Sequence, residues 1–407
     1  MVDVPALRRS FGAIAEHGDE VPLYFYSYLF LREPRLRGLF PPGMAAMRDR
    51  LVGALAKIVS DVDDLGELVP FLEHLGRDHR KFQVAAEHYP LVGEALLATL
   101  EHFLGPAWTP HLATEWAAAY GVVADVMIKS AATDAEAQQP AWWDAQIVRH
   151  ERRAPDLAVI TVQPDVEVPY QPGQSVSLQH DHRPRLWRYY SPANAPRPDR
   201  TLEFHVRAVD GGWVSSSLVA SAGPGDSLQL GSAVGELVLD RQSDDDLLMV
   251  AGGTGLAPLR AMIEQLAAPG APRRRTHLYV EARTETDHYD LAVLDRLAAA
   301  HPWLTVVPVA RCGRVHRCYA GRAADVALRQ SSWTRHQVYV CGSPGMVAET
   351  RDLLLQAGID PTRIRHESFG YRTGPTSRFL TPPVRREGDP PSDDLDLVHA
   401  PLTADWS

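Results

Sequence analysis

The chain has 407 residues, of which 45% are hydrophobic and 23% are charged, and its formal net charge is -10. This length predicts two or three domains, and this composition is typical of a folded globular protein. The acidic balance and the absence of a dense lysine or arginine tract argue against a nucleic-acid partner, and no apolar run approaches the roughly 20 residues that span a bilayer.

The cysteines do not predict a disulfide framework, because there are only three of them, Cys312, Cys318 and Cys341. The spacing CGRVHRC also lacks the close cysteine pairs of a zinc site. The N-terminal stretch MVDVPALRRSFGAI has no long apolar core and does not resemble a signal peptide. We therefore expect a cytoplasmic protein, and we expect it to act as a monomer.

Residues 1–139 are expected to form a helical module. Apolar residues recur at helical spacing in FGAIAEHGDEVPLYFYSYLF, MRDRLVGALAKIV and LVGEALLATLEHFL. A helix over residues 71–82 would place His79 on an apolar face. The other members of this face are Phe71, Leu72, Leu75 and Phe82. His79 is therefore expected on the buried side, either as a hydrogen-bonded core residue or as a metal ligand.

Beyond this module the period of the sequence changes. Within residues 143–240, DLAVITVQPD and LEFHVRAVD alternate like strands, and turns such as YQPGQ and AGPGD separate them. Within residues 244–370, strands alternate with helices, which predicts a parallel-sheet α/β module. Residues 371–407 are proline-rich and then acidic, which predicts a disordered tail.

Two glycine-rich turns in the α/β module indicate a nucleotide site. The stretch VAGGTGLAPLRAMI places Gly252, Gly253 and Gly255 between an apolar strand and a helix. Glycine lets the backbone approach a pyrophosphate, and a helix N-terminus supplies free N–H groups. The spacing is not the G-x-G-x-x-G fingerprint. A second turn, VCGSPGM, follows another strand and lies at the same edge of the sheet.

The stretches GGTGLAP and CGSPGM resemble the nucleotide-binding half of the ferredoxin reductase family. The resemblance implies that NADH or NADPH binds here. Glu281 would repel the 2′-phosphate of NADPH whereas Arg283 could bind it, so both cofactors stay open, with NADH favoured. The residues that the resemblance assigns to the nucleotide are Gly253, Thr254, Gly255, Leu256, Ala257, Pro258, Arg283, Cys341 and Gly342.

Two stretches of the second module are similar to the flavin motifs of the same family. WRYYSPANAP resembles the motif R-x-Y-[ST], and GGWVSSSL resembles the G-x-x-S turn. The resemblance implies an antiparallel β-barrel that binds FAD, with Ser175 at a position where relatives often carry tyrosine. HESFGY adds Glu367, expected to tune the flavin. The implied FAD-binding residues are Arg188, Tyr189, Tyr190, Ser191, Gly212, Val214, Ser215 and Phe369.

A helical module ahead of such a reductase unit resembles a flavohaemoglobin over residues 1–370. YFYSYLFLREPRLRGLF and RDRLVGAL resemble the distal helices of its globin domain, and LGRDHRKFQVAAEHYPLVGEALL resembles the proximal segment. The resemblance implies that His79 ligates the iron of haem b, and that Tyr26 and Tyr89 are the catalytic distal and proximal tyrosines. The implied pocket residues are Phe40, Met47 and Leu51.

Three positions of the helical module depart from this family. Met47 stands where relatives usually carry glutamine, and methionine offers no hydrogen-bond donor. Relatives carry a glutamate late in the last globin helix, for which only Asp134 or Glu136 could substitute, by a shift in register. Asp78 precedes His79 where some relatives have lysine, and its negative charge is expected to lower the haem potential.

The resemblance implies an oxidoreductase that passes electrons from NAD(P)H through FAD to haem. The implied reaction is an O2-dependent oxidation of nitric oxide to nitrate, as in nitric oxide dioxygenases that detoxify this gas. Its partners are then the small molecules O2, nitric oxide and NAD(P)H. Two alternatives stay open: an NAD(P)H-dependent reductase for another acceptor, and a sensor of oxygen or redox state.

Overall fold

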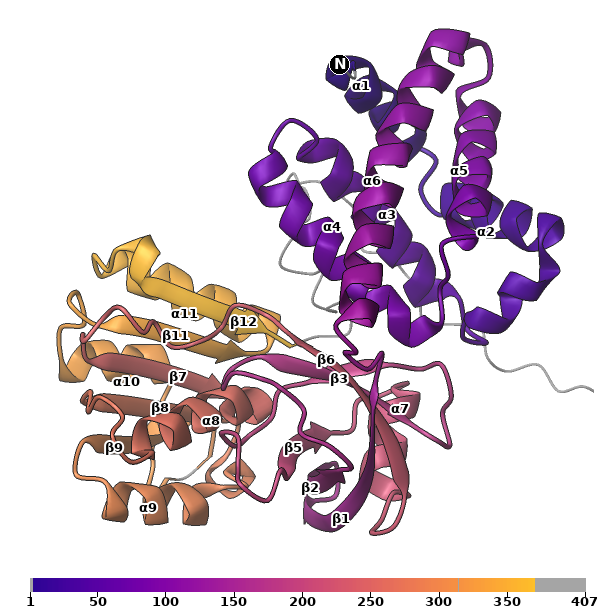
Figure 1. Ribbon diagram of the computed structural model, residues 1–407. Helices are drawn as coiled ribbons and strands as arrows, with labels where there is room; N and C mark the ends of the chain where they lie inside the picture. The colour runs from indigo at the N-terminus through magenta and orange to yellow at the C-terminus, as the bar shows by residue number, and fades with distance from the viewer. Residues whose placement is uncertain (1–2, 314, 370–407) are drawn as a thin grey trace, which may run out of the picture.

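The computed structural model describes residues 3–313 and 315–369, and the predicted tail of residues 371–407 lies outside the described residues. A helical module, a β-barrel module and an α/β module follow one another along the chain (Figure 1). Among the described residues, no helix has the length and apolar character needed to cross a membrane.

The helical module packs its helices around two apolar clusters. Caps set the ends of several helices; for example, the Thr109 side chain accepts a hydrogen bond from the Leu112 N–H at the start of the longest one, and Pro110 follows the cap. The helices are α1 (Val4–Ala15), α2 (Glu20–Arg32), α3 (Ala45–Ser60), α4 (Leu65–His79), α5 (His88–Leu104) and α6 (Pro110–Glu136).

The helix that carries His79 differs from the predicted one. We expected a helix over residues 71–82, but α4 begins at Leu65 and ends at His79. A 3-10 turn, η2 (Arg80–Phe82), follows it, and Gln83 then adopts a left-handed conformation with φ of 59°. This tight turn ends the α-helical pattern, so His79 is the last residue of α4 rather than a mid-helix residue.

A glycine brings α4 and α6 into close contact. A Cβ atom at Gly76 would lie 2.3 Å from the carbonyl oxygen of Met127, so only glycine lets the two backbones approach this closely. Near this crossing, Phe71 and Leu72 of α4 pack with Met127 in a buried cluster. The crossing therefore fixes the half of α4 that carries His79.

The β-barrel module is a six-stranded antiparallel sheet in the order β4-β3-β6-β1-β2-β5. A bridge between Pro192 and Phe204 joins the two edges of the sheet. A helix, α7 (Trp213–Ala220), packs on the barrel through Val214 and Leu218. The strands are β1 (Trp143–Ala154), β2 (Leu157–Pro164), β3 (Ser175–His180), β4 (Arg188–Tyr190), β5 (Leu202–Arg207) and β6 (Ser227–Val234).

The α/β module is a parallel sheet in the order β10-β9-β8-β7-β11-β12. The strands are β7 (Leu247–Gly252), β8 (Thr276–Ala282), β9 (Leu304–Ala310), β10 (Tyr319–Ala320), β11 (Gln337–Gly342) and β12 (Ile364–Ser368). The helices are α8 (Leu256–Ala267), α9 (Leu291–Ala300), α10 (Ala323–Gln330) and α11 (Pro344–Gln356).

Both faces of this parallel sheet are covered by helices. Met249 of β7 packs on the side of α8 and α9, whereas Val250 packs on the side of α10 and α11. The strand order reverses between β7 and β11, and a crevice at the carboxyl ends of such strands is the usual ligand site of this architecture. The two glycine-rich turns that follow β7 and β11 meet at this point.

The predicted fold class is confirmed by this architecture. The predicted boundaries at residues 139, 143, 240 and 244 stay predictions. They fall near the end of α6 at Glu136, the start of β1 at Trp143, the end of β6 at Val234 and the start of β7 at Leu247.

Candidate functional site

His79 lies at the C-terminal end of α4 with its ring held in one orientation. Its Nδ1 atom is 2.7 Å from the carbonyl oxygen of Leu75, and because a carbonyl only accepts, Nδ1 carries the proton. Burial lowers the pKa of His79, although the neighbouring Asp78 carboxylate acts to raise it. A neutral imidazole with an unprotonated Nε2 is the form that ligates haem iron, so His79 fits this cofactor.

The distal residues predicted from the sequence come together between α2 and α3. The Tyr26 hydroxyl donates a hydrogen bond of 3.1 Å to the backbone carbonyl of Met47. The rings of Tyr26 and Phe40 lie edge to face with centroids 5.5 Å apart. Phe40, Tyr26 and Leu51 are half-buried and pack against the same apolar cluster. These side chains can form one wall of a haem pocket.

Tyr89 is buried between α4, α5 and α6. Burial raises the pKa of its hydroxyl to about 12, so this group stays protonated at neutral pH. The Tyr120 hydroxyl donates a 2.6 Å hydrogen bond to the backbone carbonyl of Tyr89. A Cβ atom at Gly93 would lie 2.6 Å from the Tyr120 ring, so Gly93 makes room for this contact.

Asp134, one of the two residues expected to replace the glutamate of the relatives, pairs with Arg80 rather than with Tyr89. The Asp134 carboxylate pairs with Arg80 at 3.6 Å, just beyond the end of α4. One turn earlier on α6, the Ser130 hydroxyl donates a hydrogen bond of 2.5 Å to the carbonyl oxygen of Glu73. Asp134 therefore fixes the segment after His79.

The R-x-Y-S motif of the barrel points its two tyrosines in different directions. Tyr190 packs against the barrel core. The Tyr189 hydroxyl is 3.0 Å from one oxygen of the Asp78 carboxylate, to which it donates across the boundary between two modules. Tyr189 as a flavin contact thus stays a prediction, while its hydroxyl serves the contact with the helical module. The buried hydroxyls of Ser191 and Ser175 are 3.0 Å apart, and Arg188 is exposed.

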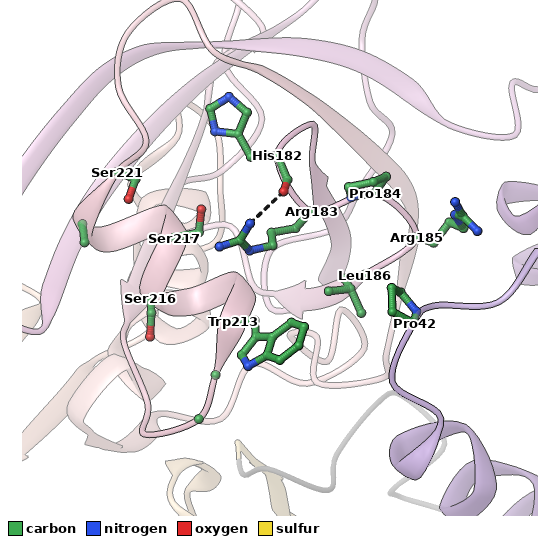
Figure 2. Close-up of a pocket in the computed structure, with 13 residues that line it drawn as sticks. Pro42, His182, Arg183, Pro184, Arg185, Leu186, Trp213, Ser216, Ser217 and Ser221 are labelled. Carbon is green, nitrogen blue, oxygen red and sulfur yellow. Dashed lines mark hydrogen bonds between the residues drawn. The ribbon is translucent and has the colours of Figure 1, made fainter. Parts of the chain in front are cut away.

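A cavity of about 710 Å³ is lined by the loop that precedes this motif in the chain (Figure 2). It is lined on one side by the loop of residues 182–186, on another by the start of α7, and by Pro42 of the helical module. The N-terminus of a helix and two basic side chains, Arg183 and Arg185, suit a pyrophosphate-bearing ligand. The cavity therefore fits FAD, whereas Arg188 and Ser191 are not among its lining residues and their contact with the flavin stays a prediction.

The G-x-x-S turn forms one edge of the cavity. The Ser215 hydroxyl accepts from the Val209 N–H at 3.3 Å and donates to the Gly212 carbonyl at 3.2 Å, so it shapes the turn itself. Gly211 has φ of 70°, which favours glycine. Val214 is buried in the barrel core, so only its backbone is available to a ligand.

Sequence reasoning missed several residues that line the cavity, namely His182, Arg183 and Trp213. Trp213 lies at the start of α7 and is 64% exposed, which is unusual for a side chain as large and apolar as tryptophan. The stretch DHRPR between two strands was the available signal, since it places basic side chains next to a proline turn beside the flavin motif.

The glycines of the two nucleotide turns have different tasks. Gly253 has φ of 54° and open space where a Cβ atom would point, so its backbone is free for a ligand to approach. A Cβ atom at Gly255 would lie 2.3 Å from the Cys341 carbonyl oxygen, which shows that Gly255 lets the two turns touch. A Cβ atom at Gly342 would lie 2.8 Å from the Met346 sulfur, so Gly342 makes room for α11.

The neighbours of these glycines serve mainly to hold the turns in place. Leu256, Ala257 and Pro258 are buried where α8 packs on the sheet, and Cys341 is fully buried in β11. Thr254 lies inside the first turn. The open face at Gly253 and the joined turns fit a dinucleotide, although which of the predicted residues touch it stays a prediction.

Glu281 lies beside the same small cavity as Gly253, and its expected effect on the 2′-phosphate stays a prediction. Its carboxylate accepts a 2.7 Å hydrogen bond from the Ala323 N–H at the start of α10 and is buried there, and burial raises its pKa. Its carboxylate therefore also stabilises a helix N-terminus. Arg283 is exposed just after β8, where its side chain is available to a phosphate.

The end of the described chain returns to the second nucleotide turn. Glu367 pairs in register with Cys341 where β12 lies beside β11. The Phe369 N–H donates a 2.8 Å hydrogen bond to the Gly342 carbonyl, and its ring packs against the α8 side of the sheet.

A buried arginine joins the barrel to the α/β module. Arg260 of α8 donates to Glu203 of β5 at 2.7 Å and to Asp290 at 2.9 Å. Its guanidinium also lies 3.1 Å from Nε2 of His205. Because breaking a buried ion pair leaves an uncompensated charge, this cluster is expected to hold the two modules together.

The Glu203 carboxylate is expected to make stability depend on pH. Burial acts to raise its pKa, but the hydrogen bond with His205 and the charge of Arg260 outweigh burial and lower the pKa from 4.5 to about 2. A depressed pKa stabilises the fold above the unfolded value of 4.5, and this stabilisation is lost as pH falls from 4.5 towards 2. It amounts to roughly 3 kcal/mol at neutral pH.

The measurement is the urea midpoint of the barrel, followed by flavin fluorescence at several pH values from 6 down to the acid limit of folding. Glu203→Gln should lower the midpoint at neutral pH and flatten its fall below pH 4.5. Glu167→Gln, at an exposed position of the same module, is the control. Parallel acid profiles in wild type and Glu203→Gln would contradict the prediction.

Models of three protein families match the chain. The globin model covers residues 23–127, the oxidoreductase FAD-binding domain covers 144–238, and the oxidoreductase NAD-binding domain covers 249–352. These matches fall on the helical, barrel and α/β modules in that order. The chain therefore has the haem, FAD and NAD(P) domains of an NAD(P)H-dependent oxidoreductase.

Two known proteins resemble this chain over all three modules. The chain is 27% identical to a flavohemoprotein of Bacillus subtilis over 390 residues, which covers 90% of this chain and 96% of that protein. A crystal structure of flavohemoglobin from Malassezia yamatoensis with bound FAD and heme has a TM-score of 0.75 and 18% identity, and covers 90% of this chain and 98% of that chain.

A third relative settles the family. The chain is 30% identical to a flavohemoprotein of Deinococcus radiodurans over 385 residues, which covers 88% of this chain and 94% of that protein. Identity of this size over nearly the whole length extends through the globin, FAD and NAD domains together. The chain belongs to the flavohemoprotein family.

Proposed function

We propose that this chain passes electrons from NAD(P)H through FAD to haem and uses O2 to oxidise nitric oxide to nitrate. The observation that carries the proposal is the contact between the predicted iron ligand and the flavin domain. The His79 and Phe82 rings have centroids 6.2 Å apart, and the Phe82 and Trp187 rings have centroids 6.5 Å apart. Trp187 directly precedes the flavin motif, so the two sites are neighbours.

The chain's own residues prepare each site. When bound, the cofactors supply hydride donation, the release of an electron pair as single electrons, and a redox-active iron. Gly253 and Arg283 would receive the nucleotide, Arg188 and Ser191 the flavin, and His79 the haem. Each proposed role depends on a group in the required state: a free backbone turn, an exposed guanidinium, or a neutral imidazole.

Tyr26 is the proposed donor on the distal side. Burial raises the pKa of its hydroxyl well above the ordinary value, although the charge of Arg50 acts to lower it. The hydroxyl therefore keeps its proton at neutral pH and can donate it to a polar ligand in the pocket. In the structure this proton is shared with the Met47 carbonyl, which keeps the hydroxyl oriented towards α3.

The activity test is nitric oxide consumption by the haem- and FAD-loaded protein, which should need both O2 and NAD(P)H. Tyr26→Phe should slow this consumption on the order of 100- to 1000-fold, since one lost donor to a developing charge has about this effect. Haem reduction by NADH should keep its rate. Tyr28→Phe on the same helix is the matched control.

Two results would contradict the proposal. Consumption of nitric oxide that continues without O2 or without NAD(P)H would exclude a dioxygenase. An unchanged rate in Tyr26→Phe would remove Tyr26 from the mechanism. Rapid reduction of quinones or ferric iron that survives loss of haem would instead support a reductase for another acceptor.

We also propose that the protein acts as a cytoplasmic monomer. In the described part of the chain, neither Cys312 nor Cys318 forms a disulfide, which suits a reducing compartment. Among the described residues, the large exposed apolar side chains are scattered over all three domains, as on most monomers. The proposed small-molecule partners are O2, nitric oxide and NAD(P)H.

A further inference from the structure

A lysine from the globin domain is buried inside the surface of the flavin barrel. The Lys81 ammonium donates to the Tyr189 hydroxyl at 2.9 Å and to the Ser177 hydroxyl at 3.0 Å, and its side chain is only 2% exposed. It also pairs with the Asp78 carboxylate of its own domain at 2.5 Å. A buried ammonium is costly without such partners, so the flavin domain supplies what this lysine needs.

A glycine of the barrel shapes the space that the lysine enters. A Cβ atom at Gly231 of β6 would lie 2.2 Å from the Ser177 hydroxyl oxygen and 3.3 Å from Cδ of Lys81. The Lys81 ammonium also lies 4.7 Å from the centroid of the Tyr189 ring and 5.3 Å from that of Trp187. We call the site formed by Ser177, Trp187, Tyr189 and Gly231 the lysine socket.

The lysine socket joins the two segments that carry the cofactor motifs. On the globin side, Asp78 directly precedes His79 and Lys81 follows it by two residues, so both anchors flank the proposed iron ligand. On the flavin side, Tyr189 is the central residue of β4 and donates to both oxygens of Asp78, at 3.0 and 3.1 Å. Any shift of the socket would therefore move the end of α4 relative to the flavin motif.

A second contact between the globin and flavin domains is exposed to solvent. Arg185 of the barrel donates to the Gly38 carbonyl at 2.7 Å, but both residues are exposed. The socket differs from this contact because the Lys81 side chain is only 2% exposed, and burial forces its charge to stay paired.

We propose that Lys81 and its socket are a positioning device that docks the globin domain on the flavin domain and thereby sets the rate of electron transfer between flavin and haem. This inference rests on the proposed electron path. One electron passes for each ferric iron that becomes ferrous, from a flavin that has accepted a hydride from NAD(P)H. Lys81, Ser177 and Gly231 neither donate nor accept that electron; they hold the two sites in place.

The main test uses a variant that keeps every charge in place. Gly231→Ala should displace the Ser177 hydroxyl and the lysine stem. In the full-length, cofactor-loaded protein, the rate of haem reduction should fall on the order of tenfold, while NADH still bleaches the flavin at the wild-type rate. The double variant Ser177→Ala/Gly231→Ala removes the closest clash and should recover most of the rate. Because no charge near His79 changes, an altered haem potential cannot explain such a loss.

A second readout does not depend on electron transfer. Hydrogen–deuterium exchange of peptides that cover residues 80–83 and 176–178 should be faster in Gly231→Ala and in Lys81→Met. Lys81→Met should also slow haem reduction on the order of tenfold. Lys129→Met, at an exposed lysine of α6, is the control and should match the wild type in both readouts.

The outcomes separate this inference from the proposed function. If the wild type bleaches its flavin but never reduces its haem, the proposed electron path is wrong and the positioning role is lost with it. If the wild type reduces haem and both variants do so at the same rate, only the positioning role is wrong, even if exchange becomes faster. Slower haem reduction with faster exchange, recovered in the double variant, supports the inference.

Discussion

Replacement of His79 by glycine is expected to lower haem affinity by at least about 100-fold, because even groups that only support a metal ligand are worth 10- to 100-fold. The structure offers a specific reason. His79 has its Nδ1 proton fixed on the Leu75 carbonyl at 2.7 Å, and its lowered pKa keeps the ring neutral. The measurement is a titration of the purified protein with haem, followed by its absorption spectrum.

Added imidazole should restore the spectrum of His79→Gly, since a free imidazole can enter the space that the side chain leaves. His74→Gly is the matched control on the same helix. Both variants lose helix propensity of about 1 kcal/mol, but only one loses the proposed ligand. A His79→Gly protein that binds haem with the wild-type affinity and spectrum would show that another residue holds the iron.

The loss of haem should leave the reductase half intact. NADH should still bleach the flavin of His79→Gly, because the FAD and NAD domains form their own sheets and cores. Electrons should then stop at the flavin or leak to O2. This split between flavin and haem reduction separates a missing iron ligand from a misfolded chain.

The order of the modules was predictable because each has its own periodicity. Apolar residues at helical spacing, then alternating strands, then strands followed by glycine turns correspond to the observed helices, barrel and parallel sheet. The position of His79 on a buried face was also predictable, since it depends only on spacing within α4. Such spacing predicts structure well because the apolar residues that produce it are the ones that each helix or strand buries.

The contacts between modules were not predictable from such signals. Tyr189 meets Asp78 of another module across 111 positions of sequence. Even within the α/β module, Glu281 meets the Ala323 amide across 42 positions. The residue types and spacing of each motif are the same whichever way these side chains turn. Lys81 likewise belongs to a charged stretch that is typical of a solvated helix end, and only the barrel surface reveals that it is buried.

The roles of individual glycines were also not predictable from the sequence. The turn GGTGLAP predicts a nucleotide site but not which glycine serves the ligand and which serves packing. The structure separates them, because open space lies beside Gly253 and the Cys341 carbonyl lies beside Gly255. The difference depends on a strand that follows some 80 residues later in the chain.

Gly255→Ala is the second change with a large expected effect, and it tests this distinction. The added Cβ atom would lie 2.3 Å from the Cys341 carbonyl oxygen and 2.7 Å from the Gly342 nitrogen, which are backbone atoms that cannot rotate away. Gly255 has φ of -59°, so alanine causes no backbone strain there and the effect is steric alone. The two nucleotide turns must therefore separate, which displaces the start of α8 and the open backbone at Gly253.

The expected result is a fall in the rate of flavin reduction by NADH on the order of 100-fold, since misplacement of a bound substrate by about 1 Å has such an effect. Stopped-flow bleaching at increasing NADH concentrations measures it and separates weaker binding from slower hydride transfer. Gly345→Ala is the matched control, because Gly345 lies at the start of α11, directly after the second nucleotide turn, with no atom within 4 Å of a Cβ there. FAD content should be unchanged in both variants, because the cavity beside α7 is formed by the barrel. If Gly255→Ala bleaches its flavin at the wild-type rate, the prediction is wrong. The two nucleotide turns could then separate without moving the nucleotide, and the sheet rather than the second turn would position the backbone at Gly253.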